Sequence, residues 1–197
     1  KDFVQLKKYA EDQNITFLSS PFDKVSLRFL LDDLKLPNIK FGSGELTNAP
    51  LLYEAALSGV RLILSTGMSS LSEVEETLGV LAFAYRQSIT EQKEQPDTSA
   101  FQAAFKSIEG QELLKKNVSL LHCTTEYPAP LESVNLLAMG TLRYRFGLET
   151  GFSDHTPGIE ISLAAVAMGA TIIEKHFTLD TKAAGPDHKA SLNPSQL

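Results

Sequence analysis

The sequence predicts an α/β fold, a (β/α)8 TIM barrel of which about six of the eight β/α units are present. Three observations support this prediction. Short apolar runs of strand length alternate with helical patterns, which favours a parallel sheet covered by helices. Each apolar run has Gly, Ser, Thr or His at or next to its end, where a strand would pass into a loop. Neither a G-x-G-x-x-G motif nor a P-loop occurs, which weakens the alternative of an open, nucleotide-binding sheet.

Six strands are expected, and they lie within ITFLSS, NIKFGSG, RLILSTG, VSLLHCT, ETGFSDH and TIIEKHF. Helices are expected over KDFVQLKKYAEDQNI, before the first of these strands, and over DKVSLRFLLDDLKL, after it. The second of these two segments repeats leucine at helical spacing. Parallel connections of this kind are right-handed, and polar residues gather at the carboxyl ends of the expected strands.

Two further helices carry local start and stop signals. Ser70 and Glu73 form a capping-box pattern at the start of one helix. The segment PGIEISLAAVAMGA has proline in its first turn and Gly169 near its end. Between them, residues 86–112 are polar and include Pro96. We expect this segment to form an extended helix, a loop and a second helix on the outer surface, as a solvated insertion rather than a site.

Composition limits the classes of function. The 197 residues suffice for one core, and we expect a single partial barrel domain over 1–197. The net charge of −6 gives no general field that attracts nucleic acid, and no apolar run is long enough to span a membrane. The lone cysteine, Cys123, excludes an intrachain disulfide and fits a reducing compartment, so we expect a cytoplasmic location.

The chain starts at Lys1 within a helical pattern and ends in SLNPSQL, which resembles a helix N-cap and first turn. We therefore expect an internal piece of a chain of roughly twice the length.

Two histidines follow neighbouring strands and set the main hypothesis about the site. Strand periodicity places Ser153 and His155 on one face, and Glu174 and His176 on one face of the next strand. Both imidazoles could therefore meet at one mouth of the barrel, where the active sites of this fold lie. Neutral imidazoles suit a divalent transition metal, and two protein ligands would leave positions for water and substrate. The alternative is that each histidine is a hydrogen-bonded core residue.

A second group of polar residues suggests an anion site. Lys40 lies near a strand end and is followed by a turn that contains Ser43 and Glu45. Glycines in that turn let backbone N–H groups approach an anion, and the lysine supplies charge; the alternative is an ordinary turn with a solvated lysine. Ser65 repeats the pattern before a helix. After the fourth strand come Thr125 and Tyr127, in HCTTEYPAP.

Other residues of the same motifs are weaker candidates for a catalytic or binding role. His122 is out of phase with Thr125, so a structural role is favoured, and Cys123 is expected to serve packing. In AAGPDHKASL, Asp187 could act as an acid, a base or an outer-sphere carboxylate, whereas His188 could be a third metal ligand but is expected on the surface. Lys175 could suggest a Schiff-base aldolase; its phase instead turns it toward the helices. The residues together indicate a metal-assisted barrel enzyme acting on an anionic, oxygen-rich small molecule.

The motifs resemble the sialic acid synthase (N-acetylneuraminate synthase) family over nearly the whole chain. The resemblance rests on IKFGSGE, ILSTGM, LLHCTTEYPAP, GFSDHTPGIEISLAAVAMGA, IIEKHFTLD and GPDHKASL. It implies a synthase that condenses phosphoenolpyruvate with N-acetylmannosamine, or a related amino sugar, and releases phosphate by C–O cleavage. It also implies a homodimer for the full-length protein. Legionaminic or pseudaminic acid synthase is the nearest alternative, and a non-catalytic barrel fragment that binds a metal or a partner through 86–112 is an alternative of another class.

The resemblance also implies roles for individual residues. His155 and His176 would hold a divalent metal, Mn²⁺ or Mg²⁺. The phosphoenolpyruvate-binding positions would be Ser20, Lys40, Ser43, Ser65 and Ser153. Glu45 and Tyr127 would face the amino sugar, with Asp187 near the sugar and the metal; Glu45, Asp187 and Lys40 would be catalytic. Thr125 is a further substrate-binding candidate, although some members carry asparagine there.

The sequence departs from the family pattern outside these motifs. The family's first two strands, which supply a further glutamate and lysine, are not in this chain. The C-terminal antifreeze-like domain, which lends an arginine to the partner subunit's site, is also absent from it. We therefore expect the 197-residue polypeptide by itself to be inactive, because two of eight strands are missing and sheet edges are exposed.

Overall fold

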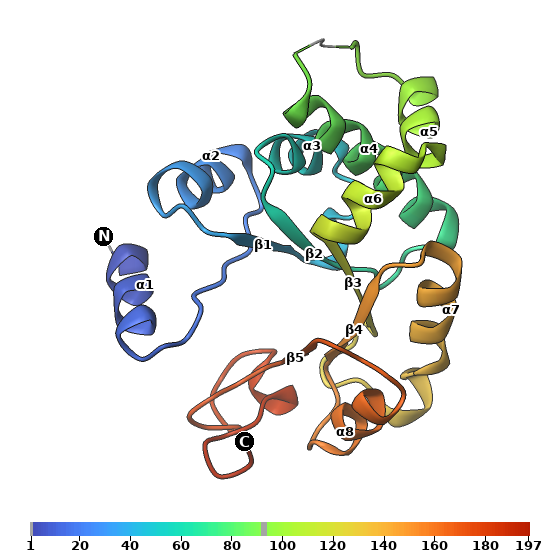
Figure 1. Ribbon diagram of the computed structural model, residues 1–197. Helices are drawn as coiled ribbons and strands as arrows, with labels where there is room; N and C mark the ends of the chain where they lie inside the picture. The colour runs from blue at the N-terminus through green and yellow to red at the C-terminus, as the bar shows by residue number, and fades with distance from the viewer. Residues whose placement is uncertain (1, 92–93) are drawn as a thin grey trace.

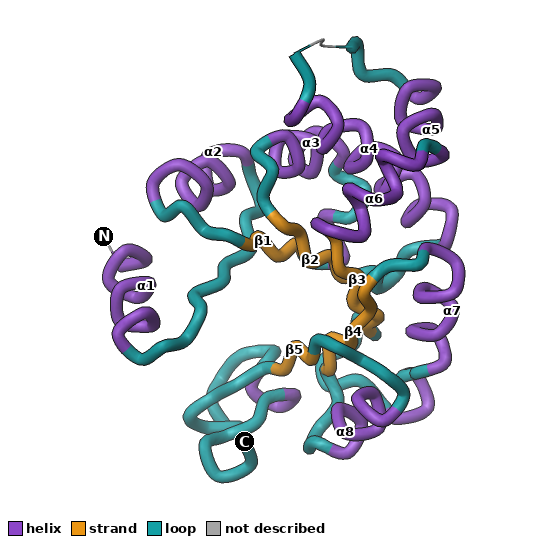
Figure 2. Tube along the Cα trace, in the orientation of Figure 1, coloured by secondary structure: helices purple, strands orange, loops and turns teal. Residues whose placement is uncertain are grey.

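The computed structural model describes residues 2–91 and 94–197, and a single parallel sheet lies at its centre. The strands are hydrogen-bonded in chain order, β1-β2-β3-β4-β5, and every neighbouring pair is parallel. Their bounds are β1 Asn38–Phe41, β2 Arg61–Ser65, β3 Val118–Cys123, β4 Glu149–Asp154 and β5 Ile173–Lys175. Figures 1 and 2 show that the sheet curls into an arc, with the helices that join the strands on its outer side. This arrangement is an incomplete TIM barrel, as the alternation of strand and helix patterns predicts.

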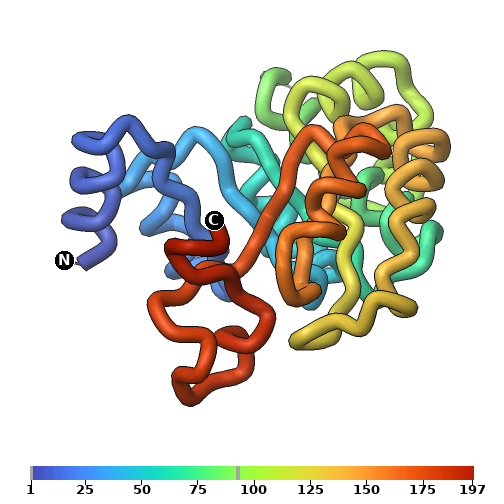
Figure 3. The backbone as a smooth tube through the Cα atoms, turned by 90° about the horizontal axis from the view of Figure 1, so that it is seen from below, coloured from blue at the N-terminus to red at the C-terminus, as the bar shows by residue number. Residues whose placement is uncertain are grey.

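Helices α2 to α8 form the layer around the outer side of the sheet, whereas α1 lies apart from it and has no buried residue (Figure 1). The α-helices are α1 Asp2–Asp12, α2 Lys24–Arg28, α3 Ala49–Leu57, α4 Leu71–Ile89, α5 Thr98–Lys106, α6 Ile108–Asn117, α7 Leu137–Phe146 and α8 Glu160–Ala167. The shorter turns are η1 Phe29–Asp33, a π-helix, and the 3₁₀ turns η2 Ser43–Glu45, η3 Leu131–Ser133 and η4 His188–Ala190. Seen from below, the chain after β5 projects away from α4 to α6 (Figure 3). No helix in the described part of the chain combines the length and apolar character that crossing a membrane requires.

Strand alternation separates a packed outer face from an inner face that carries polar groups. On the outer face, Ile39 and Phe41 of β1 and Leu62 and Leu64 of β2 are fully buried in the main core cluster with α3 and α4. The ladder register places Cys123, Ser153 and Glu174 side by side across β3, β4 and β5. Because successive side chains point to opposite faces, this row lies at the carboxyl ends of the strands and faces the inside of the arc.

Local signals in the sequence explain where two helices begin. The capping box before α4 is confirmed: the Ser70 hydroxyl accepts from the Glu73 N–H at 3.3 Å, and the Glu73 carboxylate accepts from the Ser70 N–H at 2.7 Å. Helix α8 begins at Glu160, three residues after Pro157, so the proline precedes the first turn instead of occupying it. Gly169, with φ +91°, follows the end of α8 as expected.

The prediction of six strands is wrong by one. Residues 15–20 form no strand, and the structure gives them no ladder partner among the described residues. An extended segment becomes a strand only when a neighbour pairs with its backbone groups. The last strand is also shorter than expected, because only residues 173–175 pair with β4. After the glycine–proline loop the chain returns, and Leu192 forms a parallel bridge with Phe177. Where the sequence predicts a helix start, the structure has a turn over residues 194–196, in which the Asn193 side chain accepts from the N–H groups of Ser195 and Gln196.

The polar segment 86–112 contains the end of α4, α5 and the beginning of α6; residues 92 and 93 lie outside the described part of it. The helices of this segment pack on the rest of the fold through an apolar face. The prediction of a solvated insertion therefore holds only for the outer side of the segment. The Phe101 ring meets the Phe83 ring of α4 edge to face at 5.3 Å, and Ala104 is fully buried. Gly79 allows the close approach, since a Cβ there would lie 3.1 Å from the Phe101 carbonyl oxygen.

Candidate active site

A hollow of about 570 Å³ opens at the carboxyl ends of the strands. The side chains predicted from the sequence that line it come from all five strand ends: Lys40, Ser43, Ser65, Thr125, Tyr127, Ser153, His155 and His176. Residues that the sequence did not single out for a role also line it, among them Phe22, Met68 and Glu174, together with Cys123. The hollow therefore joins the proposed metal residues and the proposed anion residues in one space.

Three predicted residues do not line this hollow. Glu45 lies in η2, and its carboxylate accepts a hydrogen bond from the Asn48 side-chain amide at 2.7 Å. Asp187 is exposed in the loop before η4. Ser20 is half-buried in the segment that precedes Phe22. Their catalytic and substrate-binding roles stay predictions.

The two histidines at the strand ends lie against each other. The ring centroids of His155 and His176 are 5.3 Å apart, and the Tyr127 ring lies 4.2 Å from the first and 5.7 Å from the second. The Nδ1–H of His155 donates to the carbonyl oxygen of Thr124 at 2.6 Å, because a carbonyl can only accept. The lone pair of this ring is therefore on Nε2. Burial lowers the pKa of His155, and the neighbouring His176 lowers it further, against the opposing effect of the Thr124 carbonyl.

The residues of this pair fit a divalent cation that is held by only two protein side chains. Among the described residues, no group of three or more His, Cys, Asp or Glu is arranged to hold a metal ion. Two neutral imidazoles would leave several positions of a metal open for water and substrate. The bond from His155 Nδ1 to a backbone carbonyl is the orientation that metal-ligating histidines usually have.

Opposite charges meet on the inner face of the sheet. The Lys40 ammonium lies 3.1 Å from Glu174 Oε2, and only 14% of the Lys40 side chain is exposed. The same carboxylate oxygen accepts from the Ser153 hydroxyl at 2.5 Å. A phosphate or carboxylate that enters the hollow therefore has to share or replace Glu174 as the partner of Lys40. The sequence holds a signal for Glu174, since this residue shares the strand face of His176, but the strand pattern does not reveal its partner on β1.

The loops after β1, β2 and β3 meet at Gly67. Its N–H donates to the Ser43 hydroxyl at 2.9 Å, and that hydroxyl lies 3.1 Å from Cys123 Sγ. Cys123 therefore lies in the hollow as well as in the packed sheet. The Ser65 hydroxyl nearby is buried and lacks a hydrogen-bond partner in the described structure. Buried polar atoms are rarely left unpaired, so an oxygen-rich ligand would supply the missing partner.

We expect Gly67→Ala to weaken the binding of an anion such as phosphate in the hollow and to lower the melting temperature. A Cβ at this position would lie 2.6 Å from Thr125 Oγ1, 2.7 Å from Cys123 Sγ and 2.9 Å from Ser43 Oγ, and such overpacking costs about 1–3 kcal/mol. Calorimetric titration and thermal unfolding would measure both effects. The matched control is Gly140→Ala in α7, where an added Cβ meets nothing within 4 Å. Unchanged ligand affinity in Gly67→Ala would show that the three loops do not act together.

The other two histidines, His122 and His188, and Lys175 are not part of the pair formed by His155 and His176. The His122 Nε2 is 2.7 Å from the Val134 carbonyl oxygen, and its ring packs near Phe152, which fits the structural role predicted from its phase. Lys175 turns away from the inner face, as its phase predicts, and pairs with Asp154. His188 is half-buried, and its Nδ1 lies 2.7 Å from the Thr178 hydroxyl. His188 is thus partly covered within its own exposed loop, and it does not line the hollow.

The fold should lose stability as the pH falls below about 6.5, the usual pKa of a histidine. Burial lowers the pKa of His122 and of His155, so the unfolded chain binds protons at a higher pH than the folded chain does. The free energy of unfolding must then decrease as the pH falls through this range. Urea unfolding between pH 8 and pH 5 would measure the decrease, which should be smaller in His122→Gln. An equal decrease in that variant would exclude His122 as a source.

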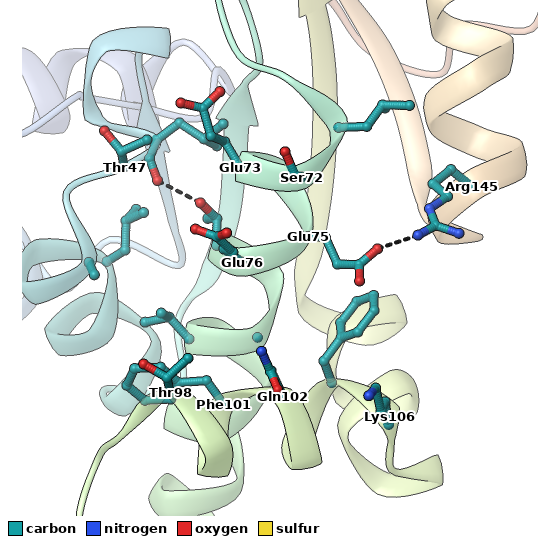
Figure 4. A pocket seen from close by; sticks show the side chains of 18 residues that line it. Thr47, Ser72, Glu73, Glu75, Glu76, Thr98, Phe101, Gln102, Lys106 and Arg145 are labelled. Atoms are coloured by element: carbon teal, nitrogen blue, oxygen red, sulfur yellow. Dashed lines mark hydrogen bonds and ion pairs between the residues drawn. The ribbon is translucent and has the colours of Figure 1, made fainter.

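A second and larger groove, of about 750 Å³, lies on the outer helical layer. Figure 4 shows Glu75 and Glu76 of α4 on one side and Phe101, Gln102 and Lys106 of α5 on another. Arg145 of α7 closes one end through an ion pair with Glu75 at 2.5 Å. None of the residues predicted to bind metal or substrate lines this groove, so its size does not make it the active site.

Comparisons with known proteins show the family to which the chain belongs. A sequence model of the NeuB family matches residues 1–197. The chain is 47% identical over 197 residues to an N,N'-diacetyllegionaminic acid synthase from Campylobacter jejuni, covering 100% of this chain and 51% of that protein. It is 38% identical over 197 residues to the synthase of the same name from Legionella pneumophila, covering 100% of this chain and 48% of the relative.

A solved structure supports the same relationship. The crystal structure of N-acetylneuraminic acid (sialic acid) synthetase from Leptospira borgpetersenii, in complex with citrate, matches with a TM-score of 0.78 and 34% sequence identity. The match covers 98% of this chain and 57% of that one. The chain thus spans about half the length of the curated relatives it matches.

Proposed function

Because the chain belongs to the NeuB family, we propose that it carries part of the active site of a phosphoenolpyruvate-dependent nonulosonate synthase. The observation that supports the proposal is one hollow that joins two facing imidazoles, the Lys40 ammonium and the unpaired Ser65 hydroxyl. The two imidazoles suit a cation, whereas Lys40 and Ser65 suit the phosphate and carboxylate of phosphoenolpyruvate. An acidic protein can bind this anion because the positive charge is local.

The proposed reaction joins phosphoenolpyruvate to the aldehyde of an N-acetylated amino sugar. A carbon–carbon bond forms between the methylene carbon and the aldehyde carbon, and the aldehyde oxygen takes up a proton. Water adds to C2 and loses a proton; the C2–O bond to phosphate then breaks as the new C2 hydroxyl loses its proton and becomes the keto oxygen of the product. His155 and His176 would hold Mn²⁺ or Mg²⁺, which when bound supplies Lewis-acid polarisation of the aldehyde oxygen.

The protein side chains would bind and orient the two substrates. Lys40, Ser43, Ser65 and Ser153 would bind phosphoenolpyruvate, with Lys40 neutralising negative charge beside the reacting carbon. The Tyr127 ring lies against His155 at 4.2 Å and meets His176 edge to face at 5.7 Å, so it would confine the sugar aldehyde to one side of the pair. Burial raises the pKa of Tyr127, and Cys123, Asp187 and Glu174 raise it further. Its phenol therefore stays protonated and can donate a hydrogen bond to the sugar.

The sugar proposed first by the sequence motifs is N-acetylmannosamine. A second candidate is a 2,4-diacetamido-trideoxyhexose, the acceptor of a legionaminic acid synthase. The identities of 47% and 38% to two synthases of that name favour the second candidate. The homodimer and the cytoplasmic location implied by the family stay predictions.

Phosphate release from phosphoenolpyruvate by the full-length gene product tests the proposal. The assay would hold Mn²⁺ constant and vary the sugar among N-acetylmannosamine, its 6-phosphate and the 2,4-diacetamido-trideoxyhexoses. Release with one sugar would establish the synthase and identify its acceptor. If the protein bound neither Mn²⁺ nor phosphoenolpyruvate, the proposed function would be wrong. If it bound only Mn²⁺, a non-catalytic binding role would be favoured.

A further inference from the structure

A buried ion pair lies directly behind the two histidines, on the opposite face of the sheet. The Lys175 ammonium is 3.1 Å from Asp154 Oδ2; the Asp154 side chain is 0% exposed and that of Lys175 is 9% exposed. The two residues are cross-strand neighbours in the ladder between β4 and β5. Removing one partner from such a pair leaves an uncompensated buried charge, which is strongly unfavourable.

The position of this pair in the chain links it to the site. Asp154 lies between Ser153 and His155, and Lys175 lies between Glu174 and His176. Because side chains alternate across a strand, the charged pair points to the outer face while its sequence neighbours point into the hollow. A shift of either strand along the ladder would therefore move one imidazole relative to the other.

The Asp154 carboxylate also fixes the backbone that follows His155. Its Oδ1 accepts from the N–H and the hydroxyl of Thr156 at 2.8 and 2.7 Å, and its Oδ2 accepts from the Ser162 hydroxyl of α8 at 2.6 Å. The Lys175 ammonium donates to the carbonyl oxygen of Thr156 as well. Both partners thus hold residue 156, immediately after the imidazole of β4, and a satisfied network of this kind favours one arrangement.

We propose that Asp154 and Lys175 are positioning residues that set the separation of His155 and His176 for binding a divalent cation. The inference rests on the proposed function, because it presupposes a cation at the histidine pair. The charged groups of Asp154 and Lys175 meet each other on the outer face of the sheet, although Lys175 is also among the residues that line the hollow. It also explains why a charged pair occupies the outer face between apolar neighbours. Phe152 and Ile173, the preceding pair in the same ladder on that face, belong to the apolar cluster beneath α8.

The test measures Mn²⁺ affinity in the full-length gene product, by electron paramagnetic resonance, for a variant that removes both charges. In Asp154→Asn/Lys175→Met the side chains keep similar volumes and no unpaired charge is buried. We expect its melting temperature to stay within about 4 °C of the wild type and its Kd for Mn²⁺ to rise about 10–100-fold. The matched control is Glu149→Gln, which removes the ion pair with Arg61 at the other end of β4; its Kd for Mn²⁺ should not change.

A milder variant keeps the inference testable if the double variant does not fold. Ser162→Ala removes one hydrogen bond to Asp154 and leaves both charges, and it should raise the Kd for Mn²⁺ about threefold. A wild-type Kd in every folded variant would overturn the positioning role and leave the proposed function untouched. Wild-type protein that binds phosphoenolpyruvate but no Mn²⁺ would instead overturn the metal site itself, and the inference with it.

Discussion

Replacing His155 or His176 by alanine should lower kcat by about 10³-fold or more, the effect of losing several kcal/mol of Lewis-acid stabilisation. Each variant removes one of two imidazoles whose ring centroids are 5.3 Å apart, so one remaining ligand would bind a cation only weakly. The effect on folding should be small, because both rings line the hollow rather than the apolar core. The loss should therefore appear in turnover and in Mn²⁺ affinity at an unchanged circular dichroism spectrum.

Phosphate release and Mn²⁺ titration, each on the full-length gene product, would measure these losses. The matched control is His122→Gln on β3, a histidine that contacts the Val134 carbonyl on the other face of the sheet. This control should retain Mn²⁺ affinity and lose only stability. Wild-type turnover in His155→Ala or His176→Ala, after treatment with a chelator, would show that the pair is structural.

Replacing Lys40 by methionine should raise the KM for phosphoenolpyruvate about 30–100-fold. A hydrogen bond to a charged group contributes about 1.5–3 kcal/mol, and about 1.4 kcal/mol corresponds to a tenfold change in affinity. The variant also deprives Glu174 of its partner at 3.1 Å. Without the lysine, the Glu174 carboxylate would repel the incoming anion. We therefore expect an increase in KM toward the upper end of the range of about 30–100-fold.

Steady-state kinetics at saturating sugar would separate this effect on KM from any effect on kcat. Lys115→Met provides the matched control, since this lysine lies on α6 at the surface and pairs with Glu112 at 3.3 Å. Its KM for phosphoenolpyruvate should equal that of the wild type. If Lys40→Met had the same KM as this control, the anion site would have to lie elsewhere.

The parts of the fold and site that follow from local patterns could be predicted from the sequence. Two-residue periodicity placed His155 and His176 on the inner face and Lys175 on the outer face, and the structure has them there. The same reasoning separated His122 from the hollow. Each of these predictions needs only the alternation of a strand and the fact that parallel strands end at one edge.

The parts that depend on distant pairing could not be predicted in this way. Residues 15–20 have the composition of a strand, but strand formation depends on a neighbour that local composition does not reveal. The role of Glu174 was missed because its partner, Lys40, is contributed by β1, far away in the sequence. The apolar contact of Phe101 with Phe83 likewise joins segments whose separate patterns look polar and amphipathic.

The order of the strands in the sheet has a consequence for how the chain acquires its site during synthesis. Since β1 to β5 are neighbours in the order in which the ribosome makes them, each new strand can dock on an edge that already exists, and no strand has to be inserted between two others. Such local additions favour rapid folding, and chains generally begin to fold from the N-terminal side during translation. Lys40 and Ser65 would be in place early, whereas the imidazole of His176 arrives with the last strand of this sheet. All the groups proposed for the anion, Ser153 of β4 included, are thus synthesised before the second imidazole proposed for the cation.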